Sequence, residues 1–204
     1  VAKYLGCPVD TDNLEYSLHV DEKYINEVKE ILKKENVDLD KKIVLVHPGG
    51  GWISRRWQSE KFAQTIDLIN ENYDVTVMLI GGKEGGASEK GLDEEIISLS
   101  KTKKIVNLTG KLTLKQLMAI FKLASLFLAN EAGPMHIATA LKVPAVAILG
   151  PTDAKRTGPF KGNTTVIQKK VPCQPCRNRT CTKVDCMKLV SVEDVFCEIN
   201  KKLS

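Results

Sequence analysis

Short apolar runs alternate with amphipathic stretches along most of the chain. Apolar runs bounded by turn residues are typical of buried strands, whereas apolar residues at intervals of three and four are typical of helices. Strands are predicted at 43–46, 75–80, 105–107, 124–129 and 145–149, and helices at 21–34, from 59 through 69, at 93–100, at 113–122 and after Pro134. This alternation predicts an α/β fold in which helices cover both faces of a parallel sheet. Asp21 and Ser59 are the predicted caps of the first two helices.

The chain is predicted to hold one domain preceded by a connecting segment. Residues 1–20 carry many turn-forming residues and little periodicity, so residues 1–40 are interpreted as a linker and lead-in helix from a missing N-terminal domain. Residues 41–204 then form one binding domain, which includes a Cys-rich segment at 171–187. A chain of 204 residues that is 43% hydrophobic can bury one good core.

Glycine clusters follow the predicted strands at 47–51, 81–84, 107–112, 130–136 and 150–153. Because the carboxyl ends of parallel strands meet at one edge of a sheet, these loops are expected to lie together, and ligands of such folds bind outside that edge. Several glycine-rich loops on one rim therefore predict a ligand pocket.

Residues 47–57, the glycine–arginine loop, combine three consecutive glycines with Arg55 and Arg56. Glycine permits close approach of a backbone to phosphate, and a guanidinium fits phosphate oxygens, so phosphate contact is the favoured interpretation. The alternative is a solvated loop in which Trp57 packs into the core. The loop lacks the Gly-Lys-Ser/Thr of a Walker motif and the acidic residue of a dinucleotide fingerprint.

The stretch 130–136 joins a predicted strand to a predicted helix through Gly133 and Pro134. Glycine allows a sharp turn, and proline fixes φ for the first helical turn. The unpaired N–H groups of that turn would face the crevice above the sheet, which suits the diphosphate of a nucleotide-linked substrate.

Five motifs occur in an order that resembles glycosyltransferase family 9, the ADP-heptose:lipopolysaccharide heptosyltransferases. They are His47-Pro48-Gly49, Arg55-Arg56-Trp57, Gly110 to Leu114, Asn130 to His136, and Gly150 to Asp153. The resemblance covers residues from about 40 to the end and is to the C-terminal half of the family. It implies a Rossmann-like C-terminal domain of the GT-B type that binds the nucleotide-sugar donor. It also implies that the catalytic base lies in the missing N-terminal domain, so that no catalytic residue is assigned in this chain.

The resemblance implies donor-binding roles for nine residues: Gly50, Gly51, Arg55, Glu84, Leu112, Glu131, Ala132, Gly133 and His136. Arg55 would face the diphosphate, Leu112 would lie near the adenine, and Glu84, with Glu89 as a competitor, would hold the ribose. The family usually has Asp-Ser/Thr-Gly where this chain has Glu131-Ala132-Gly133. Glu131 keeps the charge on a longer arm, while Ala132 removes one polar contact. Glu131 has the alternative role of a carboxylate stabilised by a helix dipole, and His136 that of a histidine hydrogen-bonded within its helix turn.

The implied reaction of the full protein is inverting transfer of heptose, or a related sugar, from an ADP-sugar to a lipopolysaccharide core, without a cofactor for the chemistry. The implied location is the cytoplasm, with peripheral association with the inner membrane. One alternative is a non-catalytic nucleotide-sugar binding module, and a second is a nucleic-acid binder acting through the cysteines. A net charge of +5 with 5% aromatic residues gives nucleic acid little support as a partner.

Four cysteines, Cys173, Cys176, Cys181 and Cys186, lie within one short segment. The Cys-x2-Cys spacing followed by two further thiols is typical of tetrahedral metal coordination, so a structural zinc or iron is one interpretation. A disulfide pair and free thiols are the other two, and all three stay open on the spacing alone.

Overall fold

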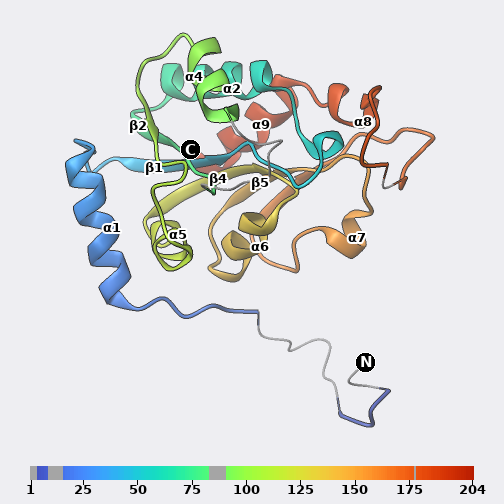
Figure 1. Ribbon diagram of the computed structural model, residues 1–204, viewed down its shortest axis with the longest axis horizontal. Coiled ribbons are helices and arrows are strands. Elements are labelled where there is room, and N and C mark those ends of the chain that lie inside the picture. The colour runs from blue at the N-terminus through green and yellow to red at the C-terminus, as the bar shows by residue number, and fades with distance from the viewer. Residues whose placement is uncertain (1–3, 9–15, 83–90, 177) are drawn as a thin grey trace.

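The computed structural model describes residues 4–8, 16–82, 91–176 and 178–204, in which a parallel sheet forms the centre (Figure 1). Its strands are β1 (Lys42–His47), β2 (Val75–Leu79), β3 (Ile105–Asn107), β4 (Ala124–Asn130), β5 (Ala145–Ile148) and β6 (Thr164–Ile167). They lie in the order β3-β2-β1-β4-β5-β6, and every neighbouring pair is parallel. The predicted α/β fold with a parallel Rossmann-like sheet is confirmed.

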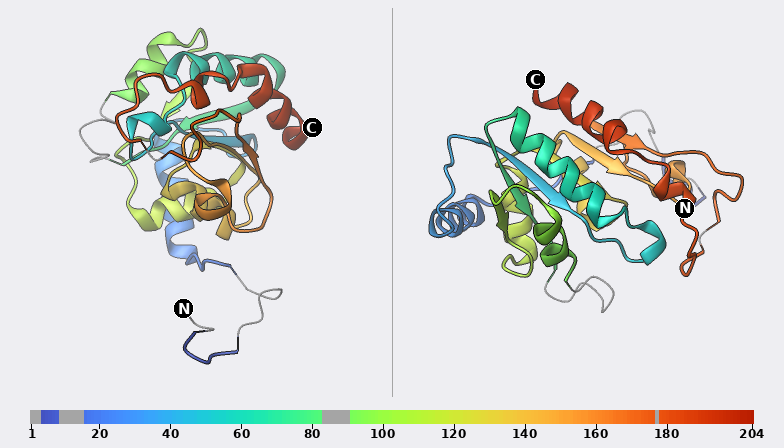
Figure 2. Two further views of the ribbon diagram at one scale, coloured as in Figure 1. Left: turned by 90° about the vertical axis from the view of Figure 1, so that its right-hand side faces the viewer. Right: turned by 90° about the horizontal axis from the view of Figure 1, so that it is seen from above.

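Helices cover both faces of the sheet (Figures 1 and 2). One face carries α1 (Glu22–Lys34), α5 (Leu114–Phe121) and α6 (Gly133–Ala140), and the other carries α2 (Ser59–Asn72), α4 (Leu92–Leu99) and α9 (Val192–Leu203). Shorter helices are η1 (Ile53–Arg55), α7 (Ala154–Thr157) and α8 (Asp185–Lys188). Among the helices of the described residues, none combines the length and the apolar character needed to cross a bilayer.

The alternation of side chains along the central strands divides the core into two layers. On β1, Val44 and Val46 face the α2 and α9 side, while Ile43 and Leu45 face the α5 and α6 side. All four are at most 2% exposed. A strand buried on both faces reads as a continuous apolar run, which is why the run at 43–46 predicts its position well.

The sheet and its cover extend beyond the predicted last strand at 145–149. The chain continues into β6, crosses the Cys-rich segment and α8, and returns through α9 over the sheet. The hydroxyl of Ser191 accepts from the Asp194 amide while the Asp194 carboxylate accepts from the Ser191 amide, so α9 begins with a capping box. The Cys-rich segment therefore lies within the fold, between the last strand of the sheet and a helix that packs on it.

Of the two predicted caps, Asp21 has the predicted position and Ser59 does not. Asp21 occupies the cap position of α1 without a side-chain cap bond, and its carboxylate instead pairs with His19 at 3.0 Å. Ser59 is the first residue of α2 and donates its hydroxyl to Glu95 on α4 at 2.8 Å. In both cases a partner elsewhere in the chain takes the polar group that a cap would have used.

Candidate functional site

The sheet order places a topological switch point between β1 and β4. From β1 the chain proceeds outward to β2 and β3, and it then returns to β4 on the other side of β1. Ligands of open parallel sheets bind outside the carboxyl ends of the strands at such a point. The glycine–arginine loop follows β1, and the turn into α6 follows β4. Two of the predicted ligand loops therefore lie side by side at this point.

Asn130, the last residue of β4, joins these loops. Its side chain is 0% exposed. The Asn130 amide nitrogen donates to the carbonyl of Pro48 at 2.7 Å, and its amide oxygen accepts from the backbone N–H of Trp57 at 3.1 Å. A single buried side chain thus holds both ends of the glycine–arginine loop against the end of β4. Asn130 stood in a predicted motif without an assigned role.

The two arginines of the loop make different contacts. Arg56 donates from Nε and Nη2 to the carbonyl of Gly50, at 3.0 and 2.9 Å, and so closes the loop on itself. Arg55 points to the turn after β4, where its Nη1 lies 3.6 Å from a carboxylate oxygen of Glu131. The Nε of Arg55 is buried without a hydrogen-bond partner among the described residues. Trp57 packs in the core at 2% exposure, which agrees with the alternative interpretation for that residue alone.

Glu131 is a buried carboxylate at the entrance to α6. It is 4% exposed and accepts a hydrogen bond from the hydroxyl of Thr152, on the loop after β5. Ala132 occupies the cap position of α6 and Gly133 is its first residue, so no side chain caps the first turn of this helix. Pro134 has no N–H and the amide of Met135 donates to the carbonyl of Ala132 at 3.0 Å, so within the first three residues of α6 the N–H of Gly133 is the one left to meet an anion. Thr152 is a site residue that the sequence analysis did not single out.

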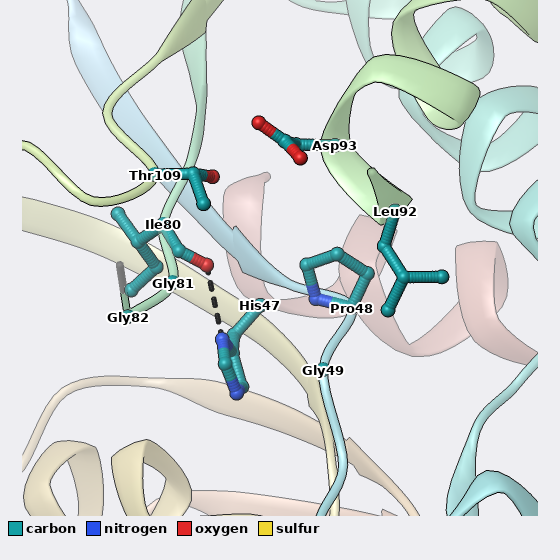
Figure 3. Close-up of a pocket in the computed structure, with 9 residues that line it drawn as sticks. All are labelled: His47, Pro48, Gly49, Ile80, Gly81, Gly82, Leu92, Asp93 and Thr109. Carbon is teal, nitrogen blue, oxygen red and sulfur yellow. Dashed lines mark hydrogen bonds between the residues drawn. The ribbon is translucent and has the colours of Figure 1, made fainter. Parts of the chain in front are cut away.

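An apolar cavity of about 210 Å³ opens beside these loops. Its lining residues are His47, Ile80, Gly81, Gly82, Leu112, Leu114, Leu117 and Pro134. Leu112, the residue expected near an adenine, is thus a wall of this cavity. The neighbouring hollow in Figure 3 shares His47, Ile80, Gly81 and Gly82 with it, and there Nδ1 of His47 lies 2.9 Å from the carbonyl oxygen of Ile80.

The remaining predicted donor residues make few contacts that bear on their predicted roles. Glu84 and Glu89 lie outside the described residues. Gly51 is exposed, and His136 is half-buried on α6. The His136 side chain makes no hydrogen bond to the described residues, so the alternative of a side chain hydrogen-bonded within its own helix turn finds no support there. A carboxylate that was not predicted, Asp93, faces the hollow of Figure 3 and accepts from the side chain of Asn107 at 2.7 Å.

Cys173, Cys176, Cys181 and Cys186 line one cavity of about 230 Å³. Ser54 of η1 shares this cavity, and its hydroxyl is buried without a hydrogen-bond partner in the described structure. Burial, followed by the nearby charges of the other three thiols, raises the pKa of Cys186. None of these cysteines forms a disulfide. Across the described residues, no three His, Cys, Asp or Glu side chains stand close enough to share a metal ion, so the four sulfurs surround a space without converging on one point.

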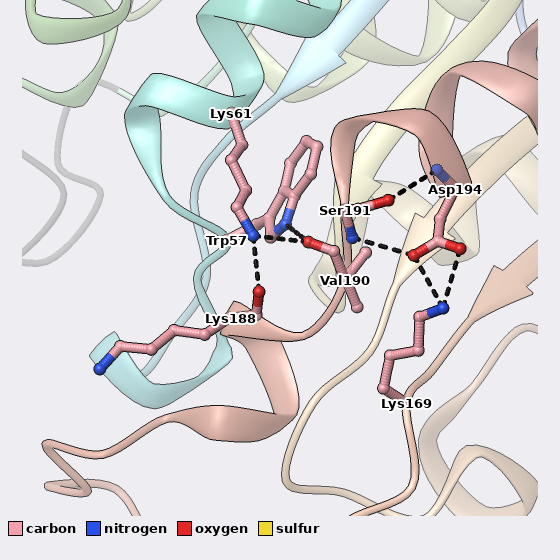
Figure 4. A network of polar contacts seen from close by, with 7 residues as sticks. All are labelled: Trp57, Lys61, Lys169, Lys188, Val190, Ser191 and Asp194. Carbon is pink, nitrogen blue, oxygen red and sulfur yellow. Dashed lines mark hydrogen bonds and ion pairs between the residues drawn. The ribbon is translucent and has the colours of Figure 1, made fainter.

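The stretch that follows the cysteines is bound to α2 and its entry (Figure 4). The indole N–H of Trp57 donates to the carbonyl of Val190 at 3.0 Å. The ammonium of Lys61 donates to the carbonyls of Lys188 and Val190 at 2.6 and 2.7 Å. Lys169, two residues after β6, pairs with Asp194 at 2.8 Å, and this ion pair connects the end of β6 to the start of α9. The residues directly after the Cys-rich segment are therefore held against Trp57, at the end of the glycine–arginine loop, and against the first turn of α2.

Comparison with known proteins adds a family to this geometry. Residues 1–186 match the sequence profile of glycosyltransferase family 9 (heptosyltransferase). Lipooligosaccharide heptosyltransferase 2 of Campylobacter jejuni is 36% identical over 170 residues, which cover 80% of this chain and 52% of that protein. The chain thus spans about half the length of the curated relatives it matches.

Two solved structures share the fold. A glycosyl transferase family 9 protein from Veillonella parvula has a TM-score of 0.83 at 21% identity, over 100% of this chain and 57% of that one. The ADP-heptose lipopolysaccharide heptosyltransferase II of Escherichia coli has a TM-score of 0.75 at 22% identity, over 96% of this chain and 55% of that one.

Proposed function

Because the chain belongs to glycosyltransferase family 9, we propose that the carboxyl edge of its sheet binds the nucleotide diphosphate of an ADP-sugar. The observation that carries this proposal is the pair of bonds made by Asn130 across the switch point. They bring a glycine-rich loop with Arg55 next to the uncapped start of α6. A guanidinium beside the N-terminus of a helix suits an anion, and the adjacent apolar cavity suits a flat base.

The donor is proposed to lie across the two loops in one direction. The adenine enters the cavity lined by Leu112, while the diphosphate lies between Arg55 and the first turn of α6 at Gly133. The loop at Gly50 and Gly51 then offers its backbone to the phosphates. The sugar reaches Glu131 and Ala132 at the end of β4, with His136 one turn further along the helix. Glu84 is the proposed ribose ligand.

The full protein is proposed to transfer heptose, or a related sugar, to a lipopolysaccharide core at the cytoplasmic side of the inner membrane. An acceptor hydroxyl would attack the anomeric carbon directly, and the bond from that carbon to the diphosphate oxygen would break with inversion. The hydroxyl proton would pass to a base outside this chain, and the electron pair would leave with ADP. Arg55 and the start of α6 would then stabilise the added charge on ADP, with no cofactor in the reaction.

The first test is nucleotide binding by the 204-residue chain. We expect calorimetry to show binding of ADP with a Kd of about micromolar to millimolar, tighter than UDP or GDP, and no sugar transfer by this chain alone. The absence of heat with ADP would contradict the donor site. Transfer by the chain alone would contradict the placement of the base in another part of the protein. A nucleotide-sugar module without activity would be indicated if the full-length protein also bound ADP-sugar and transferred nothing.

A second proposal concerns the four cysteines, which we infer take up one structural zinc or iron ion. The support is a set of four thiols around one cavity and a spacing that thiolate-bound metals use. Their side chains would have to turn inward to meet at one ion. The ion would have no part in the transfer reaction, and its role would be to hold the segment against η1.

The metal content of the protein should depend on Cys173 and Cys176, two of the exposed cysteines. Protein purified under reducing conditions should carry about one zinc or iron per chain by elemental analysis. The variant Cys173→Ser/Cys176→Ser should lose the metal, while Cys197→Ser, an exposed cysteine on α9, should keep it. Uptake should weaken as pH falls, because the thiols must deprotonate and burial already raises the pKa of Cys186. Metal-free protein whose thiols resist alkylation until reduced would indicate disulfides, and four reactive thiols would contradict both bonded states.

A further inference from the structure

Arg179 brings a second guanidinium to the glycine–arginine loop from the Cys-rich segment. Its Cζ lies 4.5 Å from the centre of the Trp52 ring, and the Cζ of Arg55 lies 3.7 Å from that same centre. The two guanidinium carbons therefore cannot be farther apart than those two distances together, a span that a diphosphate can bridge. We propose that Arg179 is a second binding residue for the donor diphosphate, an inference that rests on the proposed donor site.

The local charges favour an anion between these two arginines. Arg55 has one carboxylate nearby, that of Glu131 at 3.6 Å, and Glu131 also accepts from Thr152. Arg179 has no carboxylate partner among residues 4–8, 16–82, 91–176 and 178–204. Two cations on one indole repel each other, and a stacking interaction of an exposed guanidinium with a ring is weak, about 0.5–1 kcal/mol. A dianionic group bound to both would turn this repulsion into attraction.

Arg179 belongs to a stretch that is anchored on both sides. Before it, the amide of Cys176 donates to the carbonyl of Pro151 at 2.9 Å, and the side chain of Gln174 donates to the carbonyl of Gly150 at 2.6 Å. After it, Cys186 and Met187 are buried in the core. Both anchors use the loop after β5, which is itself part of the ligand rim. The segment can therefore present Arg179 at a defined place without a large loss of freedom on binding.

Gly150, after β5, packs closely against the side chains of α8. A Cβ at Gly150 would lie 2.4 Å from the sulfur of Met187 and 3.3 Å from that of Cys186. A side chain at position 150 would force the buried side chain of Met187 to move. The motif Gly150-Pro151 thus serves the docking of the segment that carries Arg179.

The test compares ADP with adenosine on matched variants of the 204-residue chain. Arg179→Ala should weaken ADP binding about 5- to 20-fold, which is near and below the lower limit for a hydrogen bond to a charged group because the side chain is exposed. Its adenosine affinity should be unchanged, and its ADP affinity should depend less on salt. The control Lys188→Ala removes the same charge from an exposed side chain of α8 and should change neither affinity. Arg179→Lys, which keeps the charge, should recover part of the ADP affinity, and unchanged melting temperatures would exclude misfolding.

The possible failures are distinguishable. Absence of ADP binding by the unmodified chain would overturn the donor site and this inference together. Normal ADP binding that Arg179→Ala leaves intact would overturn the inference and leave the donor site standing. Equal losses for ADP and adenosine would show that Arg179 shapes the loop through Trp52 and does not contact phosphate, which also overturns it.

Discussion

Replacing Arg55 with alanine should weaken ADP binding about 10- to 100-fold and leave adenosine binding nearly unchanged, because a guanidinium acts mainly on phosphate oxygens through charge-assisted bonds of about 1.5–3 kcal/mol. The side chain is 19% exposed, so solvent screens it less than it screens Arg179. The loss should also include a second part, since Glu131 would keep its buried charge without its cation.

Calorimetry on two further variants separates these contributions. In Arg55→Ala/Glu131→Gln the unpaired carboxylate is removed, so any ADP affinity regained over Arg55→Ala measures repulsion by Glu131. Lys34→Ala, at the exposed end of α1, is the control for loss of a distant positive charge. Equal losses of ADP and adenosine affinity in Arg55→Ala would indicate that Arg55 shapes the loop without contacting phosphate.

The variant Asn130→Ala should be less stable than the unmodified chain by about 2–4 kcal/mol. The substitution removes the hydrogen-bond partner of the Trp57 amide and of the Pro48 carbonyl. Because Asn130 is 0% exposed, water cannot replace its side chain and these polar groups are left unpaired. ADP binding should weaken as well, because both ends of the glycine–arginine loop lose their attachment to β4.

Urea unfolding measures the first effect, and Asn72→Ala is its control. Asn72 donates its side-chain amide to the carbonyl of Leu68 at 2.8 Å, at the exposed end of α2, so its replacement should change the free energy of unfolding by no more than about 0.5 kcal/mol. A cost below about 1 kcal/mol for Asn130→Ala would contradict the role given to this residue.

The central strands could be predicted from the sequence because burial on both faces makes them continuous apolar runs. The strand β6 escaped prediction since Thr164–Ile167 is short, half-buried for most of its length and preceded by turn residues. The helix α9 was not predicted, although its sequence has the apolar spacing of a helix and a capping box at Ser191 and Asp194.

The candidate site was predictable in place and less so in detail. Glycine after each strand indicated the ligand edge, which needs no knowledge of long-range contacts. The different contacts of Arg55 and Arg56 could not be predicted from two adjacent arginines in the sequence, because they depend on how the loop folds around the Gly50 carbonyl. The role of Asn130 depends on partners 73 and 82 positions away along the chain. Nothing local to Asn130 specifies those partners.

The position of α9 has a consequence for how this protein is made. Its buried residues Val192, Val195, Ile199 and Leu203 complete the layer that also holds Val44 and Val46 of β1. A ribosome therefore synthesises every strand of the sheet before it synthesises the helix that closes one face. Until α9 emerges, the part of that face over β4, β5 and β6, which α9 covers, stays open to water and to other nascent chains.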